Sequence, residues 1–244
     1  MTDAASGPRS RAIPIVVAVV LVLASFAAGW FWSAQTDRAA TERIVRDYIL
    51  ANPEILPQAM DNLARKENAR QLKGLRGEVE KPFAGAVLGN PQGTVTLVEF
   101  TDFACGYCRQ SVADVDALIA AHPDLRVVVR ELPILSPESA DAARWALAAA
   151  EQGKYAAFHR AMFMAGHPAP DTIEAAAKAA GLDMARARQA IATPQVEAEL
   201  KRNLAVARQL GFNGTPSWIV GDRILSGAVG KERLAEAIAG ARGG

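Results

Sequence analysis

Two cysteines, Cys105 and Cys108, are the residues whose type and spacing point most directly to chemistry. They are the only cysteines among 244 residues, which excludes a framework of structural disulfides. They stand where a β-branched, apolar stretch ends and a helical pattern begins, and the unpaired N–H groups of a helix start stabilise a thiolate on the first cysteine. We therefore predict that Cys105 attacks disulfides and that Cys108, one helical turn later, resolves the resulting mixed disulfide.

Three other uses of the pair compete with this interpretation. A C-x-x-C can be half of a zinc site, but such a site needs four ligands, and His122, His159 and His167 are not paired at ligand spacing. The pair could be an inert structural staple, although closing so short a loop adds little stability. Two soft thiolates can also hold Cu(I), which would make this domain a copper-binding module. We predict a redox-active disulfide, Cys105–Cys108, with no separate cofactor.

The segments around the cysteines predict an α/β fold. Residues 95–100 and 126–130 are β-branched and apolar and predict buried strands, and residues 109–122 between them have helical spacing. This order of strand, helix and strand implies a parallel pair joined by a crossover. Further on, residues 217–220 and 223–225 predict two strands joined by a turn, and a closing helix starts at Lys231.

Between these parts, residues 137 to about 209 are alanine-rich and helical, with breaks at glycines and prolines. We predict a helical insertion. Its large apolar side chains could form a client-binding surface, but core packing is the commoner use of such helical stripes. The residues concerned are Trp145, Tyr155, Phe158, Met162, Phe163 and Met164, together with Trp218 of the following strand.

From about residue 89 to residue 240 the chain resembles the DsbA-like thioredoxin fold. The resemblance rests on the C-x-x-C at a helix start, the helical insertion, and Gly214-Thr215-Pro216 before a strand. It implies that Pro216 is a cis-proline facing the cysteines and that Thr215 is its variable neighbour. It also implies that Glu99 is a buried acid beneath the site that helps proton transfer. The alternative for Glu99 is a strand-edge carboxylate facing water.

Two details resemble the disulfide isomerase DsbC and the suppressor of copper sensitivity proteins, ScsC. They are Gly106-Tyr107 between the cysteines and Thr215 before the proline; the Asn52-Pro53 turn is similar to ScsC alone. The resemblance implies an isomerase or reductase of exported proteins, kept reduced by a membrane partner of the DsbD type. The alternative is a DsbA-like oxidase, which would use a partner of the DsbB type.

The N-terminal 36 residues predict export. Residues 12–36 carry no charge, and the run at 13–32 is apolar enough and, at ~1.5 Å per residue, long enough to span a bilayer. Arg9 and Arg11 place the N-terminus in the cytoplasm and the rest of the chain on the far side. We expect a retained anchor, with a signal peptide cleaved near residue 27 as the alternative. Either places the chain in the bacterial periplasm, membrane-bound or soluble, where disulfides persist.

Residues 37–84 predict amphipathic helices separated by Asn52-Pro53. Asn52 is expected to cap the second helix, with Pro53 at its first position. The apolar stripe predicts self-association through residues 37–81, as a dimer or trimer; the alternatives are packing on the main domain or a solvated spacer. The stripe contains Ile44, Val45, Tyr48, Ile49, Ile55, Leu56, Met60, Leu63, Leu72, Leu75 and Val79.

Composition bounds the remaining possibilities. The 27 basic and 26 acidic residues give a net charge of +1, which disfavours a nucleic-acid partner, and a hydrophobic fraction of 50% supports a buried core. The glycine-rich residues 85–93 mark a boundary. We therefore predict an anchor or signal at 1–36, a helical oligomerisation region at 37–84 and a thioredoxin-like domain at 85–244.

Overall fold

A computed structural model describes residues 12–242, except for the side chains of residues 12–15, 32–37 and 39. The chain divides into two compact units, with the boundary between Asp61 and Asn62. The first unit holds α1 (Ala12–Ala51) and the start of α2 (Ile55–Leu72). Most apolar side chains of the predicted stripe are solvent-exposed here, including Ile44, Tyr48 and Met60, while Ile49 and Ile55 are half-buried.

The turn between α1 and α2 corrects one prediction. The Asn52 side chain does not cap α2; its Nδ2 donates to the Tyr48 carbonyl at 2.9 Å and so satisfies a carbonyl of the preceding helix. Pro53 lies in the turn, and α2 begins two residues later at Ile55. The break at Asn52-Pro53 is therefore present, but its side-chain hydrogen bond ends α1.

In the part of the chain that the structure describes, no helix is both long enough and apolar enough to cross a membrane. The span predicted within residues 12–36 is therefore not confirmed. Arg9 and Arg11, on which the predicted orientation depends, lie outside the described residues.

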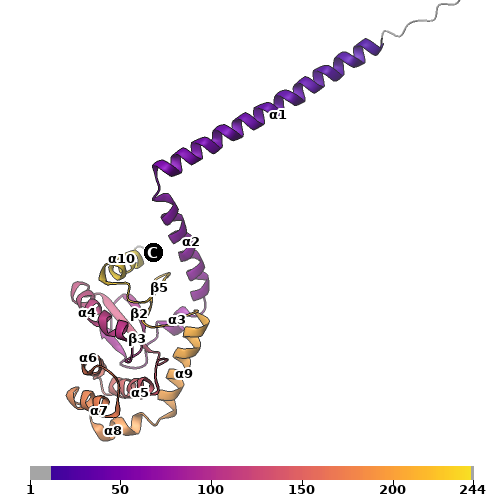
Figure 1. The fold of residues 1–244 in the computed structure, drawn as a ribbon. Helices are drawn as coiled ribbons and strands as arrows, with labels where there is room; N and C mark the ends of the chain where they lie inside the picture. Colours follow the sequence, from indigo (N-terminus) through magenta and orange to yellow (C-terminus); the bar gives the residue numbers. More distant parts are fainter. Residues whose placement is uncertain (1–11, 243–244) are drawn as a thin grey trace, which may run out of the picture. The chain divides into compact units, whose positions relative to one another are not determined.

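A five-stranded sheet forms the centre of the second unit (Figure 1). The strand order is β1-β3-β2-β4-β5, and only β2 and β3 run parallel, as the strand-helix-strand order predicted. The crossover between them is α4 (Gly106–Ala121). The strands are β1 (Val87–Gly89), β2 (Val95–Thr101), β3 (Leu125–Glu131), β4 (Ser217–Val220) and β5 (Arg223–Ser226).

β1 was not predicted, because it lies in the segment assigned to turns. The strand has only three residues, too few for an apolar alternation to show. Its last residue, Gly89, has φ +74°, and a Cβ there would lie 2.7 Å from the Leu125 carbonyl oxygen. The glycines that indicate a turn therefore also allow β1 to approach β3 closely.

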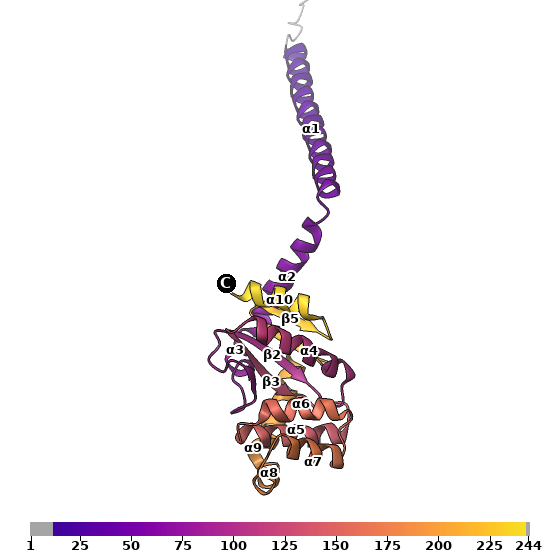
Figure 2. The ribbon, with the colours of Figure 1, turned by 90° about the vertical axis from the view of Figure 1, so that its left-hand side faces the viewer.

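Helices cover both faces of the sheet (Figure 2). On one face, α4, α6 (Tyr155–Ala165) and α10 (Lys231–Ala241) pack with the side chains of Leu97, Val127 and Val129. The predicted insertion consists of five helices: α5 (Pro137–Glu151), α6, α7 (Pro170–Ala179), α8 (Met184–Ala190) and α9 (Pro194–Gln209). Its alanines let α5 pack closely, since Ala142, Ala143 and Ala146 are all buried.

The opposite face is covered by α3 (Arg76–Val79) and α9. Leu72, Leu75 and Val79 are buried there against Val98 and Phe100 of β2. The compact unit therefore begins ahead of the predicted boundary at residue 85. This end of the predicted self-association segment packs on the domain, which was one of the alternatives.

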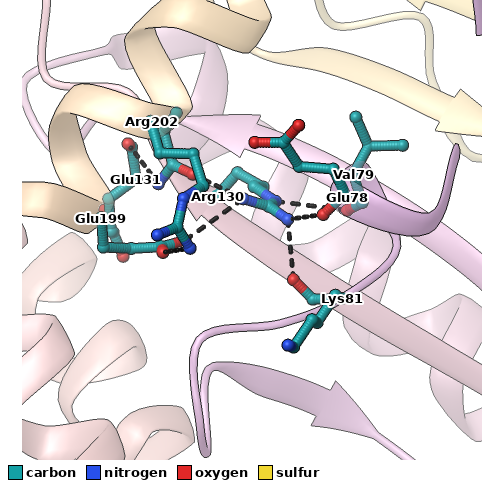
Figure 3. Close-up of polar contacts among 8 residues, drawn as sticks. Glu78, Val79, Lys81, Arg130, Glu131, Glu199 and Arg202 are labelled. Carbon is teal, nitrogen blue, oxygen red and sulfur yellow. Dashed lines mark hydrogen bonds and ion pairs between the residues drawn. The ribbon is translucent and has the colours of Figure 1, made fainter. Parts of the chain in front are cut away.

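Arg130 of β3 holds this face together (Figure 3). Its side chain is 2% exposed and donates to the carbonyls of Glu78, Val79 (3.2 Å) and Lys81 (2.7 Å), at the C-terminal end of α3. Two further donations reach α9, to Glu199 Oε1 at 3.2 Å and to Asn203 Oδ1 at 2.7 Å. One buried guanidinium thus joins the sheet, α9 and the segment that leads into the domain.

Candidate active site

Cys105 lies at the N-terminus of α4, where the helix dipole and free N–H groups can stabilise a thiolate. Cys105 is the N-cap of α4, and its Sγ accepts a hydrogen bond from the Cys108 backbone N–H at 3.4 Å. The thiol also donates to the Thr215 carbonyl oxygen at 3.2 Å. Cys105 retains 6% exposure and Cys108 none, so Cys105 is the sulfur that an approaching disulfide can reach.

Thr215 and Pro216 lie beside the cysteines although they are 110 residues away in the chain. The Thr215–Pro216 peptide bond is cis, as the resemblance implies. The pairing of Ser217 with Phe100 in the sheet holds this peptide next to the end of β2. The structure thus brings the predicted pairs, Cys105 with Cys108 and Thr215 with Pro216, to one place.

Glu99 lies inside the domain and is 3% exposed. In the sheet it is paired with Val129 and Trp218, so the alternative of a strand-edge carboxylate facing water is wrong. Burial raises the pKa of Glu99 from 4.5 to about 8, and the nearby Thr101 hydroxyl opposes the rise. That hydroxyl makes no hydrogen bond of normal geometry in the described part of the chain.

Cys108 needs a base before it can act as a nucleophile. Burial is the largest effect on its thiol and raises the pKa. The negative charge of Glu99 raises this pKa further, whereas the Thr101 hydroxyl lowers it. A carboxyl with a pKa near 8 is matched to proton exchange with a thiol close to neutral pH. We therefore expect Glu99 to be the group that takes the Cys108 proton.

We expect Glu99→Gln to slow the attack of Cys108 on a mixed disulfide at Cys105 by about a hundredfold at pH above 8, where Glu99 is ionised. Loss of the carboxylate charge lowers the Cys108 pKa, which offsets part of this effect. Rapid acid quenching and mass spectrometry across a pH series measure the rate. A variant whose rate keeps the wild-type inflection near pH 8 would exclude Glu99 as the base.

The same substitution should change how stability depends on pH. Because the folded-state pKa is raised from 4.5 to about 8, native Glu99 holds a proton that the unfolded chain releases. Its contribution is fully present below pH 4.5 and is lost as pH rises to about 8. Urea unfolding across this window should therefore show a smaller decline in stability for Glu99→Gln than for the wild type.

Gly106 and Tyr107, between the cysteines, face open space. A Cβ on Gly106 would meet no other atom within 4 Å, so packing does not require glycine there. Tyr107 is 64% exposed beside Cys105. We therefore expect both residues to contact an incoming molecule rather than to support the fold.

Two polar groups near the site were missed by sequence analysis. Asp102 is 1% exposed, and its carboxylate accepts hydrogen bonds from the active-site loop and from the loop after β3. Glu131 at the end of β3 is fully buried and accepts from the Tyr155 hydroxyl at 2.6 Å; burial raises the pKa of Glu131 and the pKa of Tyr155. An acid directly at the end of a β-branched strand is the sequence signal for both.

The predicted client surface of the insertion is mostly core. Tyr155, Phe158, Met162, Phe163 and Trp218 are buried, Trp145 is partly buried, and only Met164 is well exposed. His159 is buried among aromatic rings, and this burial lowers its pKa to about 4. Across the described residues, no three His, Cys, Asp or Glu side chains are grouped as metal ligands.

Comparison with known sequences and structures identifies two family profiles. Residues 96–239 match the DSBA-like thioredoxin domain. Residues 37–70 match the N-terminal domain of the copper resistance protein ScsC. The first profile covers the active-site cysteines and the cis-proline, and the second covers the turn at Asn52-Pro53.

Solved structures with a similar fold include two thiol-disulfide or thioredoxin-like proteins. A thioredoxin-like oxidoreductase from Silicibacter pomeroyi is 44% identical with a TM-score of 0.64, covering 67% of this chain and 95% of its own. The catalytic domain of Proteus mirabilis ScsC is 25% identical with a TM-score of 0.65, covering 72% and 98% respectively. A curated Na⁺/H⁺ antiporter NhaA from Salinispora tropica is 30% identical over 187 residues, 72% of this chain. This chain spans only 29% of that antiporter's length.

Proposed function

The chain belongs to the DsbA-like thioredoxin family, and on that premise we propose that it is a periplasmic thiol-disulfide oxidoreductase that isomerises or reduces disulfides of exported proteins. One observation carries the proposal: the Cys105 thiol lies at the N-terminus of α4, 3.2 Å from the Thr215 carbonyl oxygen beside a cis-proline. The helix N-terminus favours the thiolate, and the neighbouring backbone is available to an extended client.

The proposed reaction has two exchange steps. The Cys105 thiolate attacks one sulfur of a client disulfide, forming a mixed disulfide and releasing the other client sulfur as a thiolate. In isomerisation a client thiolate attacks the mixed disulfide, so Cys105 returns as a thiolate and no electrons are transferred overall. In reduction Cys108 gives its proton to Glu99 and attacks Cys105, which releases the client thiolate and leaves the Cys105–Cys108 disulfide with two electrons passed to the client.

Three sequence features support the isomerase or reductase direction. They are Gly106-Tyr107 between the cysteines, Thr215 before the cis-proline, and the match of residues 37–70 to the ScsC N-terminal domain. In this direction a membrane partner of the DsbD type returns electrons to the pair. The alternative is a dithiol oxidase, which would pass electrons from clients to a DsbB-type partner.

We propose that the apolar run at 13–32 holds the protein at the periplasmic side of the inner membrane, or directs export if it is cleaved. The support comes from the sequence alone, through its length and lack of charge. In either case the active site faces an oxidising compartment, where a thiol pair can cycle through a disulfide.

Self-association through residues 37–71, the part of the predicted segment ahead of the residues that pack on the domain, is the second part of this proposal. Ile44, Tyr48 and Met60 are 68%, 61% and 72% exposed on their helices, where a second copy can cover them. A dimer or trimer would present several active sites to one client. Such an arrangement supports isomerisation, because one site can hold a cysteine while another attacks.

Reactivation of scrambled ribonuclease tests the proposed direction. The full-length protein, kept reduced, is expected to restore ribonuclease activity, and Met60→Lys is expected to weaken both reactivation and self-association measured by analytical ultracentrifugation. Cys105→Ser serves as the inactive control. No reactivation, together with rapid oxidation of a reduced client, would favour the oxidase over the isomerase.

Copper binding is a second candidate, favoured by the match of residues 37–70 to the N-terminal domain of a copper resistance protein. The Cys105 and Cys108 thiolates would together hold Cu(I). A Cys105→Ser, Cys108→Ser variant that bound Cu(I) as tightly as the wild type would exclude the pair as the copper site.

A further inference from the structure

Asp102 joins two loops that meet at the active site. Its Oδ1 accepts from the Ala104 N–H at 2.8 Å, and its backbone carbonyl accepts from the Cys105 N–H at 3.0 Å. Its Oδ2 accepts from the N–H groups of Ile134 and Leu135 at 2.8 and 2.9 Å. One buried carboxylate therefore fixes the loop before Cys105 and the loop after β3.

The loop after β3 exposes apolar side chains at this point. Ile134 is 40% exposed and Leu135 is 54% exposed, although the backbone N–H groups of both are bound to a buried carboxylate. A residue whose role is core packing would be buried, so these two side chains do not serve the core. Asp102 accepts hydrogen bonds from the N–H groups of both Leu135 and Cys105. The two backbones therefore lie within about 10 Å of each other, the length of three residues in an extended strand.

The reaction itself supplies an occupant for these side chains. A client cysteine bonded to Cys105 Sγ brings its neighbouring residues over the surrounding surface. We propose that Ile134 and Leu135 form a contact site for apolar residues flanking the client cysteine, and that Asp102 is the positioning residue that holds this contact site in register with Cys105. This inference rests on the proposed thiol-disulfide exchange and adds the client chemistry that the site selects.

The hydrogen-bond pattern explains why an acid is needed at residue 102. The side chain accepts from four donors: the N–H groups of Ala104, Ile134 and Leu135, and the Ser139 hydroxyl at 3.2 Å. Both oxygens are used as acceptors. Asparagine has one acceptor oxygen, so its side chain can accept from only one of the two loops, and its NH2 group would face the donors of the other.

Two disulfide-linked peptides test the proposal. One has leucine or phenylalanine on both sides of its cysteine, and the other has serine there. The measured quantity is the ratio of their second-order rate constants for mixed-disulfide formation at Cys105. We expect a wild-type ratio well above one and a fall of about tenfold in Leu135→Ser, because the client loses an apolar contact; Leu135→Met should restore most of it.

A double-mutant cycle tests the positioning role of Asp102. If Asp102 acts by holding the loop, Leu135→Ser should lower the ratio about tenfold in the wild type and less than about twofold in Asp102→Asn. Ser139→Ala removes one donor and leaves the three backbone donations, so it separates local destabilisation from loss of the tether. All variants are first checked for folding by urea unfolding.

The outcomes separate this inference from the proposed function. Wild-type protein that forms no mixed disulfide with either peptide would overturn the proposed function. Wild-type protein that reacts equally with both peptides would overturn the contact site alone, as would a ratio unchanged in Leu135→Ser. Additive effects of Asp102→Asn and Leu135→Ser on the ratio would overturn the positioning role.

Discussion

Cys105→Ser is expected to lower the rate of disulfide exchange with any client by at least about a thousandfold, because the hydroxyl that replaces the thiol is not ionised near neutral pH. Cys108→Ser should behave differently. It retains the attacking sulfur but cannot resolve, so it should accumulate a mixed disulfide with the client. The contrast follows from the positions of the sulfurs, since Cys105 is the N-cap of α4 and Cys108 is fully buried.

Non-reducing gel electrophoresis and intact mass spectrometry after mixing with a disulfide-containing client measure both effects. Cys105→Ser should show no adduct, and Cys108→Ser should show an adduct that dithiothreitol releases. An adduct on Cys105→Ser in place of Cys108→Ser would reverse the assigned roles. Adducts of equal yield in both variants would show that the site does not distinguish the two sulfurs.

Arg130→Met is expected to lower the free energy of unfolding by about 3–5 kcal/mol. The substitution preserves most of the aliphatic length but removes the buried cation of Glu199, whose carboxylate then keeps only the half-exposed Arg202 as a partner. It also removes the donor shared by the carbonyls of Glu78, Val79 and Lys81. Breaking a buried pair by removing one partner costs more than the pair itself contributes, because the other charge stays desolvated.

Arg202→Met is the matched control. Arg202 pairs with the same Glu199, at 3.2 Å, but its side chain is 53% exposed. We expect a loss below about 1 kcal/mol, because solvent screens an exposed pair. Urea unfolding followed by tryptophan fluorescence measures both variants. Equal losses at the two positions would contradict the role given to burial at Arg130.

Much of the fold could be predicted from residue patterns. The parallel strands on either side of α4 follow from two apolar runs flanking a helical one, and the helical insertion follows from its alanine content. The predicted α/β thioredoxin fold of the DsbA kind is confirmed. The position of Cys105 also followed, because the C-x-x-C marks a helix start, whereas the cis-proline at Pro216 was implied by the resemblance to the DsbA-like family.

What the sequence could not predict depends on long-range contacts. In the sequence, Asp102 is a single acid in a loop. Its four hydrogen-bond donors belong to Ala104, Ile134, Leu135 and Ser139, which only the folded chain brings together. The burial of Leu72 and Leu75 depends on the opposite face of a sheet formed much later in the chain. Asn52 shows a different limit, because the same side chain can serve either of the helices beside it.

The central claim is that Cys105 and Cys108 cycle between a dithiol and a disulfide. A titration of the full-length protein against glutathione buffers, with thiol alkylation and mass spectrometry, tests it most directly. We expect a single two-electron transition at a potential between about −270 and −120 mV, the range of thioredoxin-fold oxidoreductases. A protein that stayed a dithiol under oxidising glutathione, or formed only adducts at one cysteine, would contradict the claim.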